Sequence, residues 1–186
     1  MPVFNTKDLL SSLAEDVNVL LKRLDEVKQL DSSLLLTQPT TDKWSVIQVL
    51  EHLNSYNRYY LPEIEKSLQN EQPFNPQFKS GWFGDYFTKM MMPGKDGKVA
   101  NKMNAPKDHR PIAELNAAAV ITEFINGEQH LLTLLQKATN TDIGRLKVPI
   151  SISRFIKLKL GDTFRFLIAH QQRHFIQLEN TLSQLS

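Results

Sequence analysis

The sequence predicts an all-α fold, a four-helix bundle with a long, partly structured connection between the second and third helices. Two observations lead to this class. Apolar residues recur every three or four positions in four long segments, 5–27, 45–68, 115–137 and 162–185, which is the period of an amphipathic helix. No convincing ladder of strands accompanies them. The chain has 186 residues, enough to bury one good core, so we expect a single domain over residues 1–186.

Composition and charge exclude several classes of protein. The chain contains no Cys, which excludes disulfides, thiolate zinc sites, iron–sulfur clusters and a cysteine nucleophile. Its net charge is +2 at pH 7, with Lys and Arg scattered among acidic residues, so we expect no nucleic-acid partner. The first eight residues do not resemble a signal peptide, and no apolar run approaches the ~20 residues that span a bilayer. We therefore expect a soluble cytoplasmic protein without a membrane partner.

The first helix should begin after Asn5, because an Asn side chain at this position can cap the first turn. Asp8 places a negative charge near the helix N-terminus, where the helix dipole favours it. Residues 31–43 contain Pro39 and several hydroxyl side chains, which compete with helix formation, so we expect an irregular connection there. The positions that repeat at helical spacing are Leu9, Leu10, Leu13, Val17, Leu20, Leu21, Leu24 and Val27.

A capping box formed by Ser45 and Gln48 should start the second helix. His52 lies within this helix. Pro62 falls in the middle of the apolar pattern, removes one backbone donor and crowds the preceding turn, so we expect a kink or a restart there. The apolar positions are Val46, Val49, Leu50, Leu53, Tyr56, Tyr60, Ile64 and Leu68.

Residues 69–111 break the periodicity with prolines and glycines but contain many aromatic and Met side chains. A connection this long in a compact domain is usually functional, and its apolar side chains need a surface to pack on. We expect a packed lid or shoulder over one end of the bundle, with a short helix at 83–92. Contact with substrate and a purely structural role, as a flap or a dimer contact, are equally open.

The third helix should cover residues 115–137 and end near Thr139. Residues 141–160 are ambiguous, because Val148, Ile150 and Ile152 alternate as in a short strand while Phe155, Ile156 and Leu160 fit a helical turn. We predict irregular structure for this segment. Asp162 or Thr163 should then cap the last helix.

The last helix contains two histidines, His170 and His174, four residues apart. Residues four apart lie on one helix face with about 6 Å of rise between them, so both imidazoles can bind one ion. Leu167 and Leu178 extend this face toward the core. His52 can supply a third imidazole if the second and fourth helices face each other, and three neutral imidazoles with an open position are typical of a catalytic metal site. Core histidines that hydrogen-bond to neighbours are an equally open explanation of the spacing.

The sequence does not match other known catalytic motifs. A zinc protease of the His-Glu-x-x-His type needs Glu directly after the first His, and Gln171 stands there. The Glu-x-x-His pairs of di-iron bundles, a Gly-rich phosphate loop and a nucleophile elbow are all absent from the sequence.

Three segments together resemble the DinB-like superfamily. Residues 44–53, Trp-Ser-Val-Ile-Gln-Val-Leu-Glu-His-Leu, are similar to its capped helix with a histidine. Residues 170–177, His-Gln-Gln-Arg-His-Phe-Ile-Gln, are similar to its closing His-x-x-x-His helix with Gln three residues later, and residues 101–106 resemble its connections. The resemblance covers most of the chain in order and spacing. It implies a four-helix bundle, frequently a homodimer, with zinc or nickel on three histidines, which by position are His52, His170 and His174.

The resemblance also implies a function. Activities in the superfamily include transfer of low-molecular-weight thiols such as bacillithiol and mycothiol-dependent isomerisation, and many members have no established reaction. We therefore expect a metal-dependent thiol S-transferase or related hydrolase with a small-molecule substrate and a thiol co-substrate. The alternative is a non-catalytic metal-binding or stress-response dimer. The length of residues 69–111 exceeds what a bare bundle needs, so no substrate is carried over from a relative.

Two further residues are candidate catalytic residues because they share helix faces with the histidines. Tyr56 lies one turn after His52, and Gln177 lies three residues after His174. Each can hydrogen-bond a substrate or orient an imidazole, and each can equally be an ordinary boundary residue. His109, in the proline-rich connection, and His130, on the third helix, are not included in the expected site.

Overall fold

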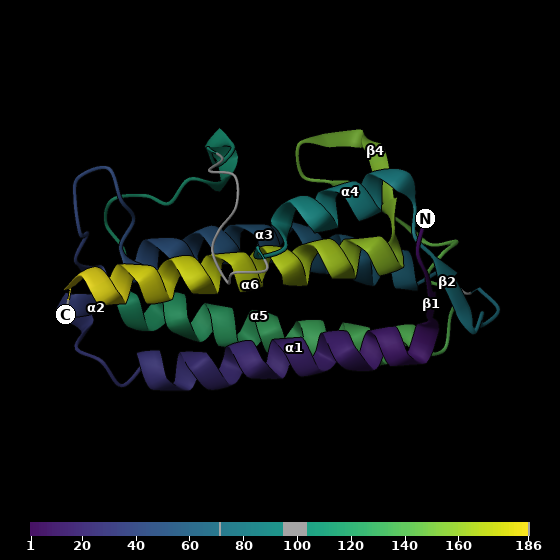
Figure 1. Cartoon of the computed structure of the whole chain (residues 1–186), viewed down its shortest axis with the longest axis horizontal. Coiled ribbons are helices and arrows are strands. Elements are labelled where there is room, and N and C mark those ends of the chain that lie inside the picture. Colours follow the sequence, from purple (N-terminus) through teal and green to yellow (C-terminus); the bar gives the residue numbers. More distant parts are fainter. Residues whose placement is uncertain (71, 95–103, 186) are drawn as a thin grey trace.

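The structure, a computed structural model, describes residues 1–70, 72–94 and 104–185. Four long helices dominate it: α1 (Thr6–Val27), α3 (Val46–Leu68), α5 (Ala117–Ala138) and α6 (Leu160–Leu185). They lie side by side as a bundle (Figure 1). The predicted four-helix bundle is therefore confirmed. Within the described residues, no helix is long and apolar enough to cross a membrane.

The direction of the helices explains the long connection. In Figure 1, α1 and α6 run one way and α3 and α5 run the other. The helix α3 contacts both α5 and α6, and α1 contacts the same two helices. Because α3 and α5 are parallel neighbours, the chain must travel back along the bundle between them, as in other bundles with a crossover. Residues 69–116 make this return, so their length follows from topology.

Local signals placed the starts of α1 and α3 correctly. The Asn5 side chain accepts hydrogen bonds from the backbone N–H groups of Lys7 and Asp8. Ser45 and Gln48 form the reciprocal capping box at the start of α3. The helix α3 then continues through Pro62 to Leu68 as one helix, so the alternative of a restart is wrong, and the kink stays a prediction. Buried side chains on both sides of Pro62 pack into the core and hold this part of the helix in place.

Small elements occur where irregular structure was expected. A short helix, α2 (Ser32–Leu36), is capped by the Asp31 side chain and buries Leu35. The strands β3 (Lys147–Ile150) and β4 (Ser153–Lys159) form an antiparallel hairpin. The expectation of irregular structure at residues 141–160 is therefore wrong, because Val148, Ile150 and Leu158 bury their side chains against the bundle. A second antiparallel pair joins β1 (Val3–Asn5) to β2 (Gln77–Lys79).

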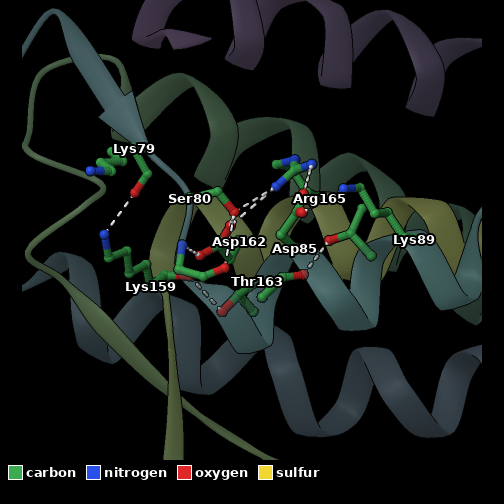
Figure 2. A network of polar contacts seen from close by, with 11 residues as sticks. Lys79, Ser80, Asp85, Lys89, Lys159, Asp162, Thr163 and Arg165 are labelled. Carbon is green, nitrogen blue, oxygen red and sulfur yellow. Dashed lines mark hydrogen bonds and ion pairs between the residues drawn. The ribbon is translucent and has the colours of Figure 1, made fainter. Parts of the chain in front are cut away.

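The predicted short helix is present as α4 (Trp82–Met91), which packs on α6. Figure 2 shows the polar network that holds α4 against α6. The Asp162 carboxylate accepts hydrogen bonds from the Gly81 N–H (2.8 Å) and the Ser80 hydroxyl, and the Arg165 guanidinium lies 3.2 Å from Asp162 and 3.3 Å from Asp85. The helix α6 begins at Leu160, so the predicted cap at Asp162 or Thr163 is wrong. Asp162 instead binds the segment that enters α4.

Gly84 allows α4 to approach α6 closely. A Cβ atom at Gly84 would lie 2.3 Å from Cβ of Asp162. Gly84→Ala should therefore lower the free energy of unfolding by about 1–3 kcal/mol, although Ala favours helix over Gly. Urea unfolding followed by circular dichroism measures the change. Phe83→Ala, at the exposed neighbouring position, should change stability much less, and equal stability of Gly84→Ala and the wild type would contradict the close approach.

Two apolar clusters fill the bundle, one toward each end. Along α3, the buried apolar side chains up to Leu53 belong to one cluster and those from Tyr56 onward belong to the other. Along α6, the corresponding boundary lies between Ala169 and Phe175. His170 and His174 lie within this boundary on α6, and His52 lies one residue before it on α3.

Candidate metal centre

The structure brings together the three histidines that the sequence singled out. His52 comes from α3, and His170 and His174 come from the neighbouring helix α6. One ring nitrogen from each residue lies within 4.8 Å of the others. Nε2 of His52 lies 3.3 Å from Nε2 of His170, and the ring centroids of His52 and His174 are 4.6 Å apart. These nitrogens converge on one point between the helices.

Two neighbouring groups orient the imidazoles. Nδ1 of His52 lies 2.7 Å from the backbone carbonyl oxygen of His109, which can only accept, so Nδ1 donates and Nε2 keeps its lone pair. Nδ1 of His174 lies 2.9 Å from Oε1 of Gln177 and donates in the same way. Such acceptors fix ring orientation and tautomer at metal sites. Gln177 thus contacts an imidazole, which is one of the two roles considered for it from the sequence.

The donor set fits a divalent ion. Two imidazole nitrogens at 2.0–2.1 Å from one tetrahedral ion lie about 3.3 Å apart, which matches the distance between the Nε2 atoms of His52 and His170. Neutral imidazole is a good ligand for zinc and for nickel. Nδ1 of His170 is buried and has no hydrogen-bond partner among the described residues, so no neighbour fixes the tautomer of this ring. Its ring is free to present Nε2 to an ion.

Burial keeps all three imidazoles neutral. It lowers the pKa of His52 to about 4 and that of His174 to about 3. Burial also holds the pKa of His170 well below its usual value, and the charged forms of His174 and His52 would lower it further. Protonated imidazole cannot bind a metal, so these depressed pKa values prepare the site for an ion at neutral pH.

Tyr56 and His109 form a wall of the site. The Tyr56 ring stacks on His109 with centroids 4.0 Å apart and lies 4.3 Å from the ring of His170. Burial raises the pKa of Tyr56 to about 12, so its hydroxyl stays protonated at neutral pH and can donate a hydrogen bond. Tyr56, a candidate from the sequence, therefore contacts the histidines directly.

His109 belongs to the site, although the interpretation of the sequence left it out. It lies in a short 3₁₀ helix, η1 (Lys107–His109), on the crossover segment, and its Nδ1 lies 2.9 Å from Oγ of Ser55. No local pattern marks this residue, because its position depends on the path of the crossover. His130, also left out, is 39% exposed and lies near Glu65, away from the three imidazoles.

Gln171 occupies the position of the catalytic Glu in a zinc protease, but its side chain hydrogen-bonds to residues other than the three histidines. Its Nε2 donates to Glu128 (2.6 Å) and to the side-chain oxygen of Asn57 (3.3 Å). Burial raises the pKa of Glu128 to about 8, so this carboxyl is mostly protonated at neutral pH. The cluster ties α3, α5 and α6 together and supplies no general base to the histidines.

Comparison with known proteins shows the family and the fold of the chain. A family model described as the DinB superfamily matches residues 12–178, which is most of the chain. The chain belongs to the DinB superfamily. Among solved structures it is similar to YfiT from Bacillus subtilis, described as a probable metal-dependent hydrolase with an unusual four-helix bundle topology. The two share 19% identity with a TM-score of 0.55, over 95% of this chain and 85% of YfiT, so the likeness concerns the fold. No curated protein matches the chain.

Within this DinB superfamily site, Gln177 offers a test of imidazole orientation. Gln177→Ala should lower the affinity for zinc by about tenfold, because His174 loses the acceptor that orients its ring. Competition with a chromogenic chelator measures the affinity. Gln184→Ala, an exposed glutamine near the end of the same helix, is the matched control and should bind zinc as the wild type does. Equal affinity of all three proteins would contradict a role for Gln177.

Proposed function

We propose that this chain is a divalent-metal-dependent enzyme that activates a small nucleophile at an ion held by His52, His170 and His174. The observation that carries the proposal is the convergence of three imidazole nitrogens within 4.8 Å, two of them from buried histidines and the third from the partly exposed His174. A divalent ion on neutral ligands keeps its full charge and makes a nearby water or thiol more acidic. Zinc or nickel is the ion that we expect.

The residues around the histidines support this chemistry by position. The His109 carbonyl and Gln177 hold two imidazoles in place, and the Tyr56 hydroxyl stays protonated at neutral pH. His52 and His170 are buried, whereas His174 and Gln177 are partly exposed. We infer that a substrate approaches from the side of His174 and Gln177.

Two reactions fit the proposal, and each has its own support. Hydrolysis is supported by the similar fold of YfiT, a probable metal-dependent hydrolase. Thiol transfer of the bacillithiol type is supported by the resemblance in residues 44–53 and 170–177. The absence of Cys from the chain is compatible with thiol transfer, because a low-molecular-weight thiol would bring its own sulfur. The homodimer and the cytoplasmic location stay expectations from the sequence.

Activity assays test the proposal. Zinc-loaded and nickel-loaded protein should be incubated with bacillithiol, glutathione or coenzyme A and the electrophile monochlorobimane, and separately with small esters and amides. We expect the wild type to turn over the substrates of one of these two sets at least about a hundredfold faster than His52→Ala does. His130→Ala, which replaces an exposed histidine outside the site, should retain the full rate. Metal binding without a rate above the His52→Ala control in either set would favour the non-catalytic metal-binding alternative.

A further inference from the structure

A groove separate from the histidines lies between the second half of α3 and the β3–β4 hairpin. Its cavity volume is about 370 Å³, which is within the range of small-molecule sites. Three turns of α3 form one side and the two strands form the other. The lining residues are Tyr59, Glu63, Lys66, Ser67, Asn70, Lys147, Pro149, Arg154 and Lys157.

Positive charge dominates this groove. Four cations line it, Lys66 from α3 and Lys147, Arg154 and Lys157 from the hairpin, whereas Glu63 is the one carboxylate among the lining residues. Within the part of the chain that the structure describes, none of the four cations forms an ion pair. The groove therefore concentrates positive charge that the protein itself does not neutralise.

The fold holds these cations together. β3 pairs with β4 so that Lys147 lies opposite Lys159 and Pro149 lies opposite Lys157, which places several ammonium groups on one face of the hairpin. Partial burial lowers the pKa of Lys147 and the neighbouring Lys159 ammonium lowers it further, whereas the Asp162 carboxylate acts in the opposite direction and raises it. Lys159 is not among the lining residues and donates to the Lys79 carbonyl oxygen (2.7 Å), whereas Lys147 and Lys157 both line the groove. The like charges of Lys147 and Lys157 repel each other, and an anion bound between them would relieve the repulsion.

Uncharged groups in the groove suit an organic ligand. The Tyr59 hydroxyl donates to the backbone carbonyl of Ile150 (3.1 Å), which holds the ring as part of the wall. Ser67 and Asn70 add polar side chains next to the cations. The volume exceeds the roughly 30 Å³ of one water molecule about tenfold, so the groove has room for more than a single simple ion.

The groove lies on the same face of α3 as the metal centre. Tyr59, Glu63 and Lys66 follow His52 and Tyr56 at intervals of three and four residues. The helix rise puts Tyr59 about 10 Å and Lys66 about 21 Å beyond His52 along the axis. Lys66 is therefore too distant to touch an ion on the histidines, and the lining of the groove contains none of the three histidines, so occupancy of the groove can be measured on metal-free protein.

We propose that this groove binds a small soluble molecule with at least two negative charges, carried by phosphate or carboxylate groups. Lys and Arg are the side chains that bind such groups, and the arginine fork fits either one. The proposal does not depend on the metal centre or on the reaction that takes place there.

Isothermal titration calorimetry of metal-free protein with inorganic pyrophosphate and with citrate tests the proposal. We expect one molecule of at least one anion to bind per chain. Lys147→Gln/Lys157→Gln should weaken binding at least about tenfold. Lys22→Gln/Lys43→Gln removes the same charge from the opposite end of the bundle and should change the affinity less than about twofold. Circular dichroism checks that all variants stay folded.

A second variant should strengthen anion binding, whereas the lysine variants weaken it. Glu63→Gln removes the negative charge from the lining and should tighten anion binding about threefold, which a loss of local structure would not produce. Absence of binding up to about 10 mM of both anions, or equal weakening in the two double variants, overturns the proposal. Phe155, beside Arg154, is 99% exposed, so vesicles of phosphatidylglycerol are a further probe. Vesicle binding without pyrophosphate or citrate binding would assign the groove to a lipid headgroup and overturn a soluble ligand.

Discussion

His170→Ala should lower the affinity for zinc and for nickel by at least about a hundredfold while the chain stays helical. Loss of a group that only orients a ligand costs 10–100-fold, so loss of a ligand should reach or exceed the upper end of that range. His170 is 3% exposed, and its Nε2 lies 3.3 Å from Nε2 of His52. Without it, two imidazoles from different helices remain, too few for the three-histidine site.

Metal analysis of untagged protein after growth with added metal measures this effect, and chelator competition gives the affinity. His130→Ala is the matched control, because His130 is 39% exposed and lies near Glu65, outside the site. This variant should bind one equivalent as the wild type does. An unchanged stoichiometry and affinity in His170→Ala would remove His170 from the ligand set and favour the explanation that the histidines are core residues.

The sequence revealed those parts of the fold and site that depend on local chemistry. Asn5 and Ser45 mark helix starts because an N-cap uses only the residues of its own first turn. His170 and His174 were paired because helix geometry alone puts residues four apart on one face. His52 joined them through the bundle and the family resemblance, and the structure places its ring next to both. Ion binding by these three residues stays a prediction.

The missing parts depend on contacts between distant residues. β1 pairs with β2 across more than 70 residues, and such pairing leaves no periodic signal in a three-residue strand. His109 reaches His52 only because α3 and α5 are parallel and the crossover returns past the site. Asp162 looks like a helix cap by residue type, yet its partners are Ser80 and Gly81, about 80 residues earlier. Tertiary contacts decide these positions.

Acid should destabilise the metal-free protein between pH 7 and pH 5. Unfolded histidine has a pKa near 6.5, whereas burial lowers the pKa of folded His52 to about 4 and of His174 to about 3, with His170 well below the usual value. Below pH 6.5 the unfolded chain therefore binds more protons, so stability falls as the pH falls. From pH 7 to pH 5 each of these three histidines lowers the free energy of unfolding by about 2 kcal/mol, and His109, whose pKa burial also lowers, adds to the loss.

Glu128 acts in the opposite direction and must be counted with the histidines. Burial raises its folded pKa from 4.5 to about 8, so between these values the folded chain binds the extra proton and stability rises as the pH falls. From pH 7 to pH 5, proton uptake by this carboxyl raises the free energy of unfolding by about 2.5 kcal/mol. The free energy of unfolding of the wild type should therefore fall by at least about 3 kcal/mol over this range. That of Glu128→Gln, which has no proton to take up at residue 128, should fall by at least about 6 kcal/mol.

Urea unfolding at pH 7 and pH 5, in the presence of a chelator, separates the two contributions. The steeper loss in Glu128→Gln is the decisive comparison, because both proteins keep the same histidines and differ only in whether residue 128 binds a proton. A wild type that is equally stable at both pH values, together with a Glu128→Gln variant that is also unchanged, would show that the histidines are not held neutral by burial. The same result would remove the physical basis for a site that is ready to bind an ion at neutral pH.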